Sequence, residues 1–191
     1  MPVLEQEIKI PVAAFAPVRG RLAELRARCQ VPFTLEDNWV LDDDHGSLAA
    51  SGRLLRVRRA GQRCWVTLKE PASFEGGVKS RVELETGVAD ADGALAVFRR
   101  LGFAAVRRYQ KRRETWAFGD FVVALDETPL GGFVEVEGPG DRLAAAAVDL
   151  GLNPATAARG TYLDLWHAYR ALHPDAPPDM LFSAESAVRP E

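Results

Sequence analysis

Ionisable side chains occur at every second position in several segments of the sequence. Glu5, Glu7 and Lys9 alternate with amide or aliphatic residues, and the same two-residue step recurs further along the chain. Successive side chains of a β-strand point to opposite faces, so each alternating set lies on one face of one strand. The other members are Arg56, Arg58, Lys69, Lys79, Arg81, Glu83, Glu85, Lys111, Arg113, Asp126, Glu135 and Glu137.

These residue types favour the binding of a polyanion together with a metal ion. Carboxylates are the only candidate metal ligands in the set, and oxygen donors favour Mg²⁺ or Mn²⁺ over zinc. Guanidinium and ammonium groups from several strands suit a ligand with many anionic oxygens. Metal ions and cationic side chains recur together in phosphoryl transfer, so the set predicts a metal–polyphosphate site. The P-loop pattern Gly-x-x-x-x-Gly-Lys-Ser/Thr is absent.

Two arrangements of the strands fit the alternating charges. For a single strand, a solvent-exposed face with cross-strand ion pairs is the ordinary interpretation. For the whole series, the opposite faces are strongly aliphatic, and all four lysines of the chain belong to the charged set. A closed or strongly curved sheet with the charges inside explains the series better. Because an unpaired buried ion costs several kcal/mol, such an interior must be wet, internally paired or built to hold ions.

The remaining pattern indicates an α+β protein dominated by an antiparallel sheet or barrel. We expect helices over residues 13–28, from Asp90 or Asp92 to about 101, over 141–150 and over 162–172. A single domain over residues 1–172 would be followed by a Pro-rich tail, 173–191, that is partly ordered at most. The expected strands are 3–10, 34–41, 53–59, 63–69, 79–87, 106–116, 120–127 and 133–137.

The charged segments resemble the ordered motifs of the CYTH domain, also called the triphosphate tunnel metalloenzyme superfamily. Glu5-Gln-Glu-Ile-Lys9 resembles the Glu-x-Glu-x-Lys signature that opens the domain, and the resemblance extends over about residues 3–172. The other matching segments are Leu54-Leu-Arg-Val-Arg58, Thr67-Leu-Lys69, Lys79-Ser-Arg-Val-Glu-Leu-Glu85, Lys111-Arg-Arg113, Leu125-Asp-Glu127, Gly132-Phe-Val-Glu-Val-Glu137 and Thr161-Tyr162. The segment from Glu36 to Asp42 matches only loosely.

The resemblance implies an eight-stranded antiparallel β-barrel, or tunnel, with a charged interior and helices packed outside. It implies that divalent metal is held by Glu5, Glu7, Glu135 and Glu137. It implies that triphosphate is bound by Lys9, Arg56, Arg58, Lys69, Arg81, Lys111 and Arg113. Catalytic roles fall to Glu5, Glu7, Lys9 and Glu85, with Lys79, Glu83 and Asp126 as assisting residues.

Known members of this superfamily are class IV adenylyl cyclases, thiamine triphosphatases and inorganic triphosphatases. We expect a metal-dependent enzyme that hydrolyses inorganic triphosphate or a nucleoside triphosphate. A class IV adenylyl cyclase is the alternative, although the His-Phe that some cyclases carry before the first motif is missing from Met1–Leu4. A polyphosphate- or nucleotide-binding module without turnover, and a scaffold with solvent-facing charges, remain open. Trp65 shares the parity of Lys69 and is either a core or rim residue or a platform for a nucleobase.

Composition narrows the classes of partner. The 191 residues carry a net charge of -3, which gives no reason to expect binding to nucleic acid or to an anionic membrane. No apolar run approaches a membrane span, and the first residues do not read as a signal peptide. Two cysteines are too few for a disulfide framework. We therefore expect a cytoplasmic protein with a small-molecule triphosphate substrate, and a homodimer is left open.

Overall fold

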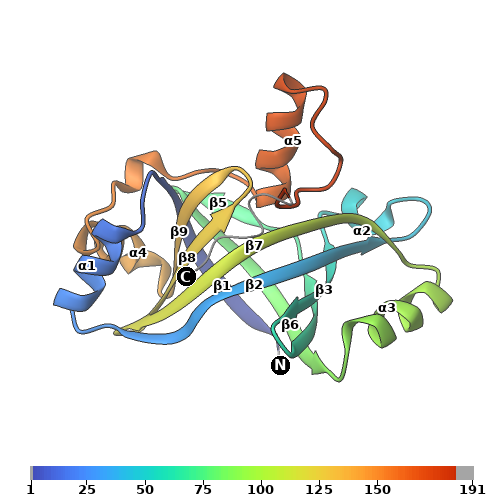
Figure 1. The fold of residues 1–191 in the computed structure, drawn as a ribbon, viewed down its shortest axis with the longest axis horizontal. Coiled ribbons are helices and arrows are strands. Elements are labelled where there is room, and N and C mark those ends of the chain that lie inside the picture. The colour runs from blue at the N-terminus through green and yellow to red at the C-terminus, as the bar shows by residue number, and fades with distance from the viewer. Residues whose placement is uncertain (1, 184–191) are drawn as a thin grey trace.

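A computed structural model describes residues 2–183, whose strands form one antiparallel sheet that closes into a barrel (Figure 1). The strand order is β1-β9-β8-β7-β2-β3-β4-β6-β5, and β1 also pairs with β6. This pairing closes eight strands into the predicted barrel and leaves β5 at its margin. The strands are β1 (Val3–Val12), β2 (Arg28–Asp42), β3 (Leu54–Ala60), β4 (Arg63–Lys69), β5 (Ser73–Glu75), β6 (Val78–Val88), β7 (Ala104–Phe118), β8 (Phe121–Thr128) and β9 (Gly131–Glu137).

The helices lie outside the barrel, as predicted for an α+β fold (Figure 1). The helix expected over 13–28 is shorter in the structure, because Arg26 adopts a φ of 56° and ends the turn. The helices are α1 (Ala16–Glu24), α2 (Ser47–Ala50), α3 (Ala91–Arg100), α4 (Leu143–Asp149) and α5 (Tyr162–Leu172), with 3₁₀ turns at Gly140–Arg142 and Pro154–Thr156.

Strand β2 begins earlier than the sequence pattern predicts. The expected strand begins at residue 34, after Pro32, but Pro32 lies inside β2 where the ladder with β7 is interrupted between Val31 and Thr34. An irregularity of this kind tolerates a residue without a backbone N–H, so the strand continues past the proline. The long strands β2 and β7 that result run side by side along the barrel (Figure 1).

The apolar residues of the strands face outward and pack under helices. Ile8, Ile10, Val134 and Val136 belong to a buried cluster that also contains Leu22 of α1. A second cluster lies under α3 and includes Leu41, Leu55, Val57, Cys64 and Ala91. Because the outward faces supply these cores, the charged faces point into the barrel. The arrangement in which the charges face bulk solvent is therefore wrong.

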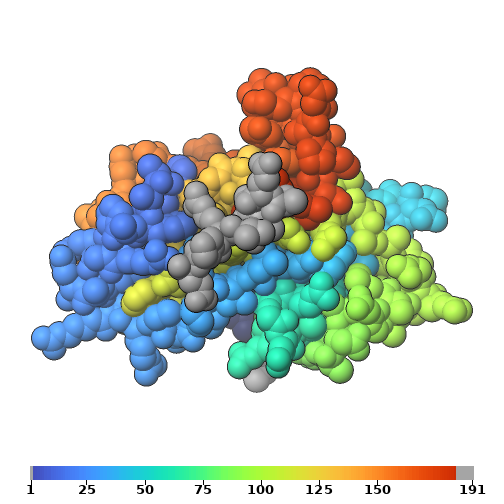
Figure 2. All heavy atoms as spheres, in the orientation of Figure 1, coloured from blue at the N-terminus to red at the C-terminus, as the bar shows by residue number. Residues whose placement is uncertain are grey.

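Helix α5 and the following segment pack together on the barrel. In the space-filling view, α5 rises from the body of the molecule (Figure 2). Met180 is fully buried beside Trp166, and its backbone pairs with β7 through bonds of 3.1 Å to Arg108 O and 2.8 Å from Gln110 N. Met180 thus anchors residues 173–183 of the Pro-rich segment. The predicted tail boundary stays a prediction, and residues 184–191 lie outside the described part of the chain.

Candidate active site

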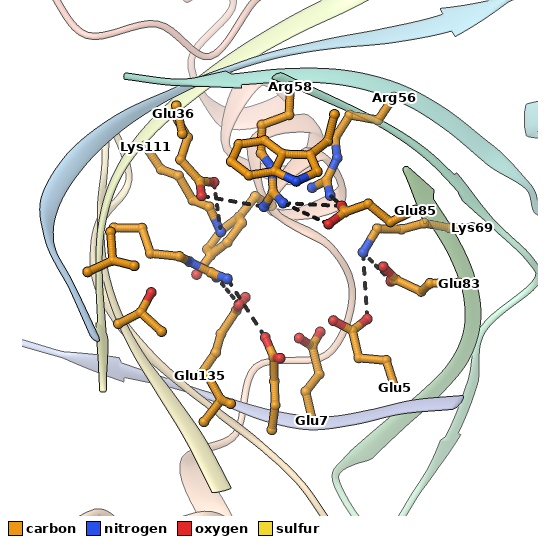
Figure 3. A pocket seen from close by; sticks show the side chains of 18 of the residues that line it. Glu5, Glu7, Glu36, Arg56, Arg58, Lys69, Glu83, Glu85, Lys111 and Glu135 are labelled. Atoms are coloured by element: carbon orange, nitrogen blue, oxygen red, sulfur yellow. Dashed lines mark hydrogen bonds and ion pairs between the residues drawn. The ribbon is translucent and has the colours of Figure 1, made fainter. Parts of the chain in front are cut away.

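The barrel encloses a cavity of about 1050 Å³ that is lined by side chains from all eight of its strands. All but one of the predicted site residues line this cavity, although they come from segments more than 100 residues apart. Figure 3 shows carboxylates and cationic groups converging on its interior. The exception is Asp126, which lies in the wall with no exposed surface. The strand periodicity therefore predicted most of the charged side chains that point into the barrel.

Three carboxylates form a cluster on one side of the cavity. Glu5, Glu7 and Glu137 each offer one oxygen, and these oxygens lie within 4.8 Å of one another. The cluster arises because β1 places Glu7 opposite Glu137 of β9, with Glu5 two positions away on the same face.

Two of the three carboxyl groups in the cluster resist ionisation. Burial raises the pKa of Glu137 to about 8; Arg113 opposes this rise, and the charges of nearby carboxylates add to it. Burial and a hydrogen bond with Glu83 likewise raise the pKa of Glu5. Within residues 2–183, the buried Glu5 Oε2 has no hydrogen-bond partner. Carboxylate oxygens that are crowded together in this way fit a hard divalent cation such as Mg²⁺ or Mn²⁺, whose charge would favour their ionised form.

Glu135, the fourth predicted metal ligand, has different neighbours. Its carboxylate lies 3.2 Å from Lys9 Nζ and accepts a hydrogen bond from Arg113. Burial would raise the pKa of Glu135, but the charges of Lys9 and Arg113 hold it well below its ordinary value. The structure thus brings three of the four predicted ligands into one cluster and pairs the fourth with cations.

Guanidinium groups form the opposite side of the cavity. Arg58 lies 3.4 Å from Glu36 and 3.1 Å from Glu85, and Arg56 donates to Thr67 Oγ1 at 3.2 Å. In the described chain, the buried Nε atoms of Arg56 and Arg58 have no hydrogen-bond partner. Unused donors in a buried cavity favour a ligand with many acceptor oxygens.

Other predicted cations are engaged by the protein itself. Lys69 binds Glu83 and lies 3.6 Å from Glu5, while Lys79 Nζ lies 2.7 Å from Glu7. Arg81 lines the cavity, but its guanidinium donates to the backbone carbonyls of residues 52 and 70. Because these contacts occupy side-chain donors of Lys79 and Arg81, the two residues are less available to bind an anion than Arg56 and Arg58.

Asp126 is buried in the barrel wall and pairs with two cationic side chains that line the cavity. It accepts hydrogen bonds from Lys111 at 3.0 Å and from Arg113 at 2.7 and 2.6 Å. The hydroxyl of Tyr162 also donates to it at 2.7 Å. This geometry agrees with an assisting residue rather than one that contacts a ligand.

Sequence reasoning missed Glu36 and Tyr162 as lining residues. The charges of Lys111, Arg113 and Arg58 outweigh burial and lower the pKa of Glu36 to about 2. Its Oε2 is buried and, among described groups, has no hydrogen-bond partner. Glu36 shares a strand face with Thr34 and Asn38. Because these two neighbours are uncharged, this strand lacks the alternating charges that marked the other interior faces. Tyr162 reaches the cavity from helix α5, for which strand parity carries no signal.

Trp65 also lines the cavity, and the guanidinium of Arg58 lies 4.9 Å from the centroid of its ring. The guanidinium of Arg58 therefore covers one face of the Trp65 ring. Whether the indole also serves as a platform for a nucleobase stays a prediction.

A closed antiparallel barrel with an ionic interior defines the class of β-barrel tunnel proteins. The sequence model of the CYTH domain matches residues 4–152. The chain therefore belongs to the CYTH family, whose members are triphosphatases or adenylyl cyclases. A search of curated proteins finds no match.

Solved structures share the fold at low sequence identity. A proposed adenylate cyclase from Vibrio parahaemolyticus has 19% identity and a TM-score of 0.77, with 86% of this chain and 98% of that chain covered. The PH1012 protein of Pyrococcus horikoshii OT3 has 24% identity and a TM-score of 0.70, covering 84% and 98%. HpAC1 from Hippeastrum, a proposed adenylyl cyclase with a dominant triphosphatase activity, has 16% identity and a TM-score of 0.66, covering 88% and 96%.

Within residues 2–183, no helix has both the length and the apolar character needed to cross a membrane.

Proposed function

We propose that this protein is a divalent-metal-dependent phosphohydrolase that acts on inorganic triphosphate or a nucleoside triphosphate. One observation carries the proposal: a cluster of three carboxylates faces buried guanidinium groups across a single cavity. A cation-binding cluster and an anion-binding wall in one wet space suit a ligand that is itself a metal–polyphosphate complex.

In the proposed site, Glu5, Glu7 and Glu137 would hold Mg²⁺ or Mn²⁺, and Glu135 is a further proposed ligand. When bound, the ion polarises phosphate oxygens and lowers the pKa of a water molecule. The proposed triphosphate-binding groups are Lys9, Arg56, Arg58, Lys69, Arg81, Lys111 and Arg113. They neutralise charge as the water oxygen bonds to phosphorus, the bridging P–O bond breaks and the water proton leaves to solvent.

The proposed catalytic residues are Glu5, Glu7, Lys9 and Glu85. Glu85 accepts hydrogen bonds from Thr67 at 2.7 Å and from Arg58 at 3.1 Å, which fix its carboxylate at the edge of the guanidinium group. Glu83 and Lys79 hold Lys69 and Glu7 in place from neighbouring positions. These contacts support assisting roles for Glu83 and Lys79.

An adenylyl cyclase is the second candidate, since the structural neighbour from Vibrio parahaemolyticus is described as a proposed adenylate cyclase. In that reaction, the ribose 3′-hydroxyl attacks the α-phosphorus and releases pyrophosphate. The dominant triphosphatase activity described for HpAC1, a neighbour with the same fold, supports hydrolysis as the first choice. A binding module without turnover is less well supported, because Glu5, Glu7 and Glu137 would repel a bare polyanion.

Product analysis separates these functions. Purified protein is incubated with tripolyphosphate or ATP in the presence of Mg²⁺ or Mn²⁺, and the products are resolved by anion exchange. Orthophosphate release supports hydrolysis, whereas cyclic AMP with pyrophosphate supports the cyclase. The Glu7→Gln variant should lower kcat/KM at least about 100-fold, because a several-kcal/mol contribution of the metal is lost.

Glu24→Gln serves as the matched control, because Glu24 is exposed on α1 and pairs with Arg21 outside the barrel. Its kcat/KM should equal that of the wild type. Neither product from the wild type, together with unchanged metal binding in Glu7→Gln, would refute the catalytic assignment.

A further inference from the structure

The ammonium group of Lys9 is enclosed on three sides by groups of the protein. Its Nζ lies 3.2 Å from Glu135 Oε1, donates to the carbonyl oxygen of Gly160 at 3.4 Å, and lies 4.1 Å from the centroid of the Tyr162 ring. An ammonium has three N–H bonds, and these contacts supply three partners. Two of the partners come from the segment that leads into α5, so this segment determines where the charge of Lys9 lies.

The same aromatic ring attracts a second ammonium group. Lys111 Nζ lies 5.2 Å from the centroid of the Tyr162 ring, within the range of a cation–π interaction. Lys9 belongs to β1 and Lys111 to β7, which are not neighbours in the barrel. The ring of Tyr162 thus contacts ammonium groups from two strands that are not neighbours, and both lysines line the cavity.

The hydroxyl of Tyr162 extends this influence to a third cation. It donates to Asp126 Oδ2 at 2.7 Å, and the same oxygen accepts from Lys111 at 3.0 Å and from Arg113 at 2.6 Å. Asp126 is completely buried, so nothing from solvent can replace a missing donor.

Packing holds Tyr162 itself in a single orientation. Its ring meets Phe133 edge to face, with centroids 5.3 Å apart and an interplanar angle of 73°. It is the first residue of α5, directly after Thr161, which forms a capping box with Asp164. A rigid support of this kind suits a residue that orients others.

We propose that Tyr162 is a positioning residue that orients Lys9 and Lys111 through its ring, and Arg113 through Asp126, for binding the triphosphate. The inference rests on the proposed function. Tyr162 does not react with the substrate; it determines the direction in which three cationic groups present their charge to the cavity. The residue lies beyond the segment 4–152 that the family model matches, in the Thr161-Tyr162 pair that resembles a family motif.

Lysine ammonium NMR tests the positioning without any activity measurement. The chain has four lysines, so the full-length protein labelled with ¹⁵N at lysine yields four ammonium signals to assign. We expect the ring current of Tyr162 to shield the Lys9 and Lys111 signals. Tyr162→Leu should remove this shielding and Tyr162→Phe should retain it, while Lys69 and Lys79 serve as internal references. A Lys9 signal that is unchanged in Tyr162→Leu overturns the proposal.

Calorimetric titration with tripolyphosphate, carried out both without metal and with Mg²⁺, tests the consequence for binding. Tyr162→Leu should raise Kd about tenfold, because it removes the cation–π contacts with Lys9 and Lys111 and the hydroxyl bond to Asp126. Tyr162→Phe keeps the ring and should raise Kd about threefold. A melting curve of each variant reports folding, and Tyr162→Phe, whose packing is preserved, decides the matter if Tyr162→Leu is unfolded.

Tyr169→Leu is the matched control on the same helix. Tyr169 stacks on Trp166 at 5.1 Å and on His173 at 4.0 Å, outside the set of residues that line the cavity. This variant should lower Tm while leaving Kd within about twofold of the wild type. Equal Kd values for wild type, Tyr162→Leu and Tyr162→Phe overturn the positioning role alone, whereas a wild type that binds tripolyphosphate neither without metal nor with Mg²⁺ overturns the proposed function.

Discussion

Glu7 of β1 and Glu137 of β9 are direct partners across the antiparallel ladder, so two carboxylates occupy adjacent positions on one interior face. Like charges in such a pair oppose folding, and here Glu5 adds a third. The aliphatic cores on the outer faces of the same strands stabilise the arrangement. The barrel thereby places a carboxylate cluster across the cavity from the guanidinium groups of Arg56 and Arg58.

The pH dependence of stability should reveal this charge. The pKa of Glu137 is about 8 in the folded protein against an ordinary 4.5. Between these values the unfolded chain releases a proton that the folded protein keeps, so the free energy of unfolding of metal-free protein falls as pH rises. Urea denaturation at several pH values measures the slope, which Glu137→Gln should reduce and saturating Mg²⁺ should offset. Glu24→Gln should keep the wild-type slope, and a flat wild-type profile would contradict this assignment.

Asp126 should be important for stability because it neutralises buried cations. Asp126→Asn leaves Lys111 and Arg113 without their shared carboxylate, and we expect a loss of about 3–5 kcal/mol in the free energy of unfolding. Asp120→Asn removes an exposed ion pair with Arg142 and should cost at most about 1 kcal/mol. Denaturant titration of both variants measures the difference, and equal losses would show that Asp126 is not the support for these cations.

Arg58 should contribute to anion binding through the shape of its guanidinium. Arg58→Lys keeps the positive charge but removes the planar set of donors, so Kd for tripolyphosphate should rise about tenfold. The control is Arg99→Lys on α3, which lies outside the lining of the cavity. Calorimetry measures Kd for both variants. An unchanged Kd in Arg58→Lys would show that residue 58 contributes to binding through its charge and not through the planar guanidinium.

Met180 should anchor the segment that follows α5. Its side chain has no exposed surface and contacts the cluster that contains Trp166. Met180→Ala should lower the free energy of unfolding by about 2–5 kcal/mol, whereas Leu172→Ala at an exposed position should change it by less than about 0.5 kcal/mol. Chemical denaturation provides the comparison, and an insignificant effect of Met180→Ala would indicate that this segment adds nothing to the core.

Much of the interior could be predicted from the sequence because the side-chain period of a strand is a local property. Strand periodicity predicts that Glu5, Glu7 and Lys9 share one face, and that Arg56 and Arg58 share another, whichever strands pair with them. The aliphatic residues between them also indicate that the opposite face is the buried apolar one. These two facts together predicted a closed or strongly curved sheet with the charges inside.

The roles of individual residues depended on tertiary structure. Glu135 and Glu137 occupy one Glu-x-Glu motif, yet the register of β9 pairs Glu135 with Lys9 and Glu137 with Glu7. Glu135 therefore forms an ion pair with Lys9, whereas Glu137 belongs to the carboxylate cluster. Tyr162 is likewise an ordinary first residue of a helix until the chain folds it against Lys9 and Asp126. Periodicity is encoded by neighbouring residues, whereas register and closure arise from contacts between distant segments, and only the folded chain establishes them.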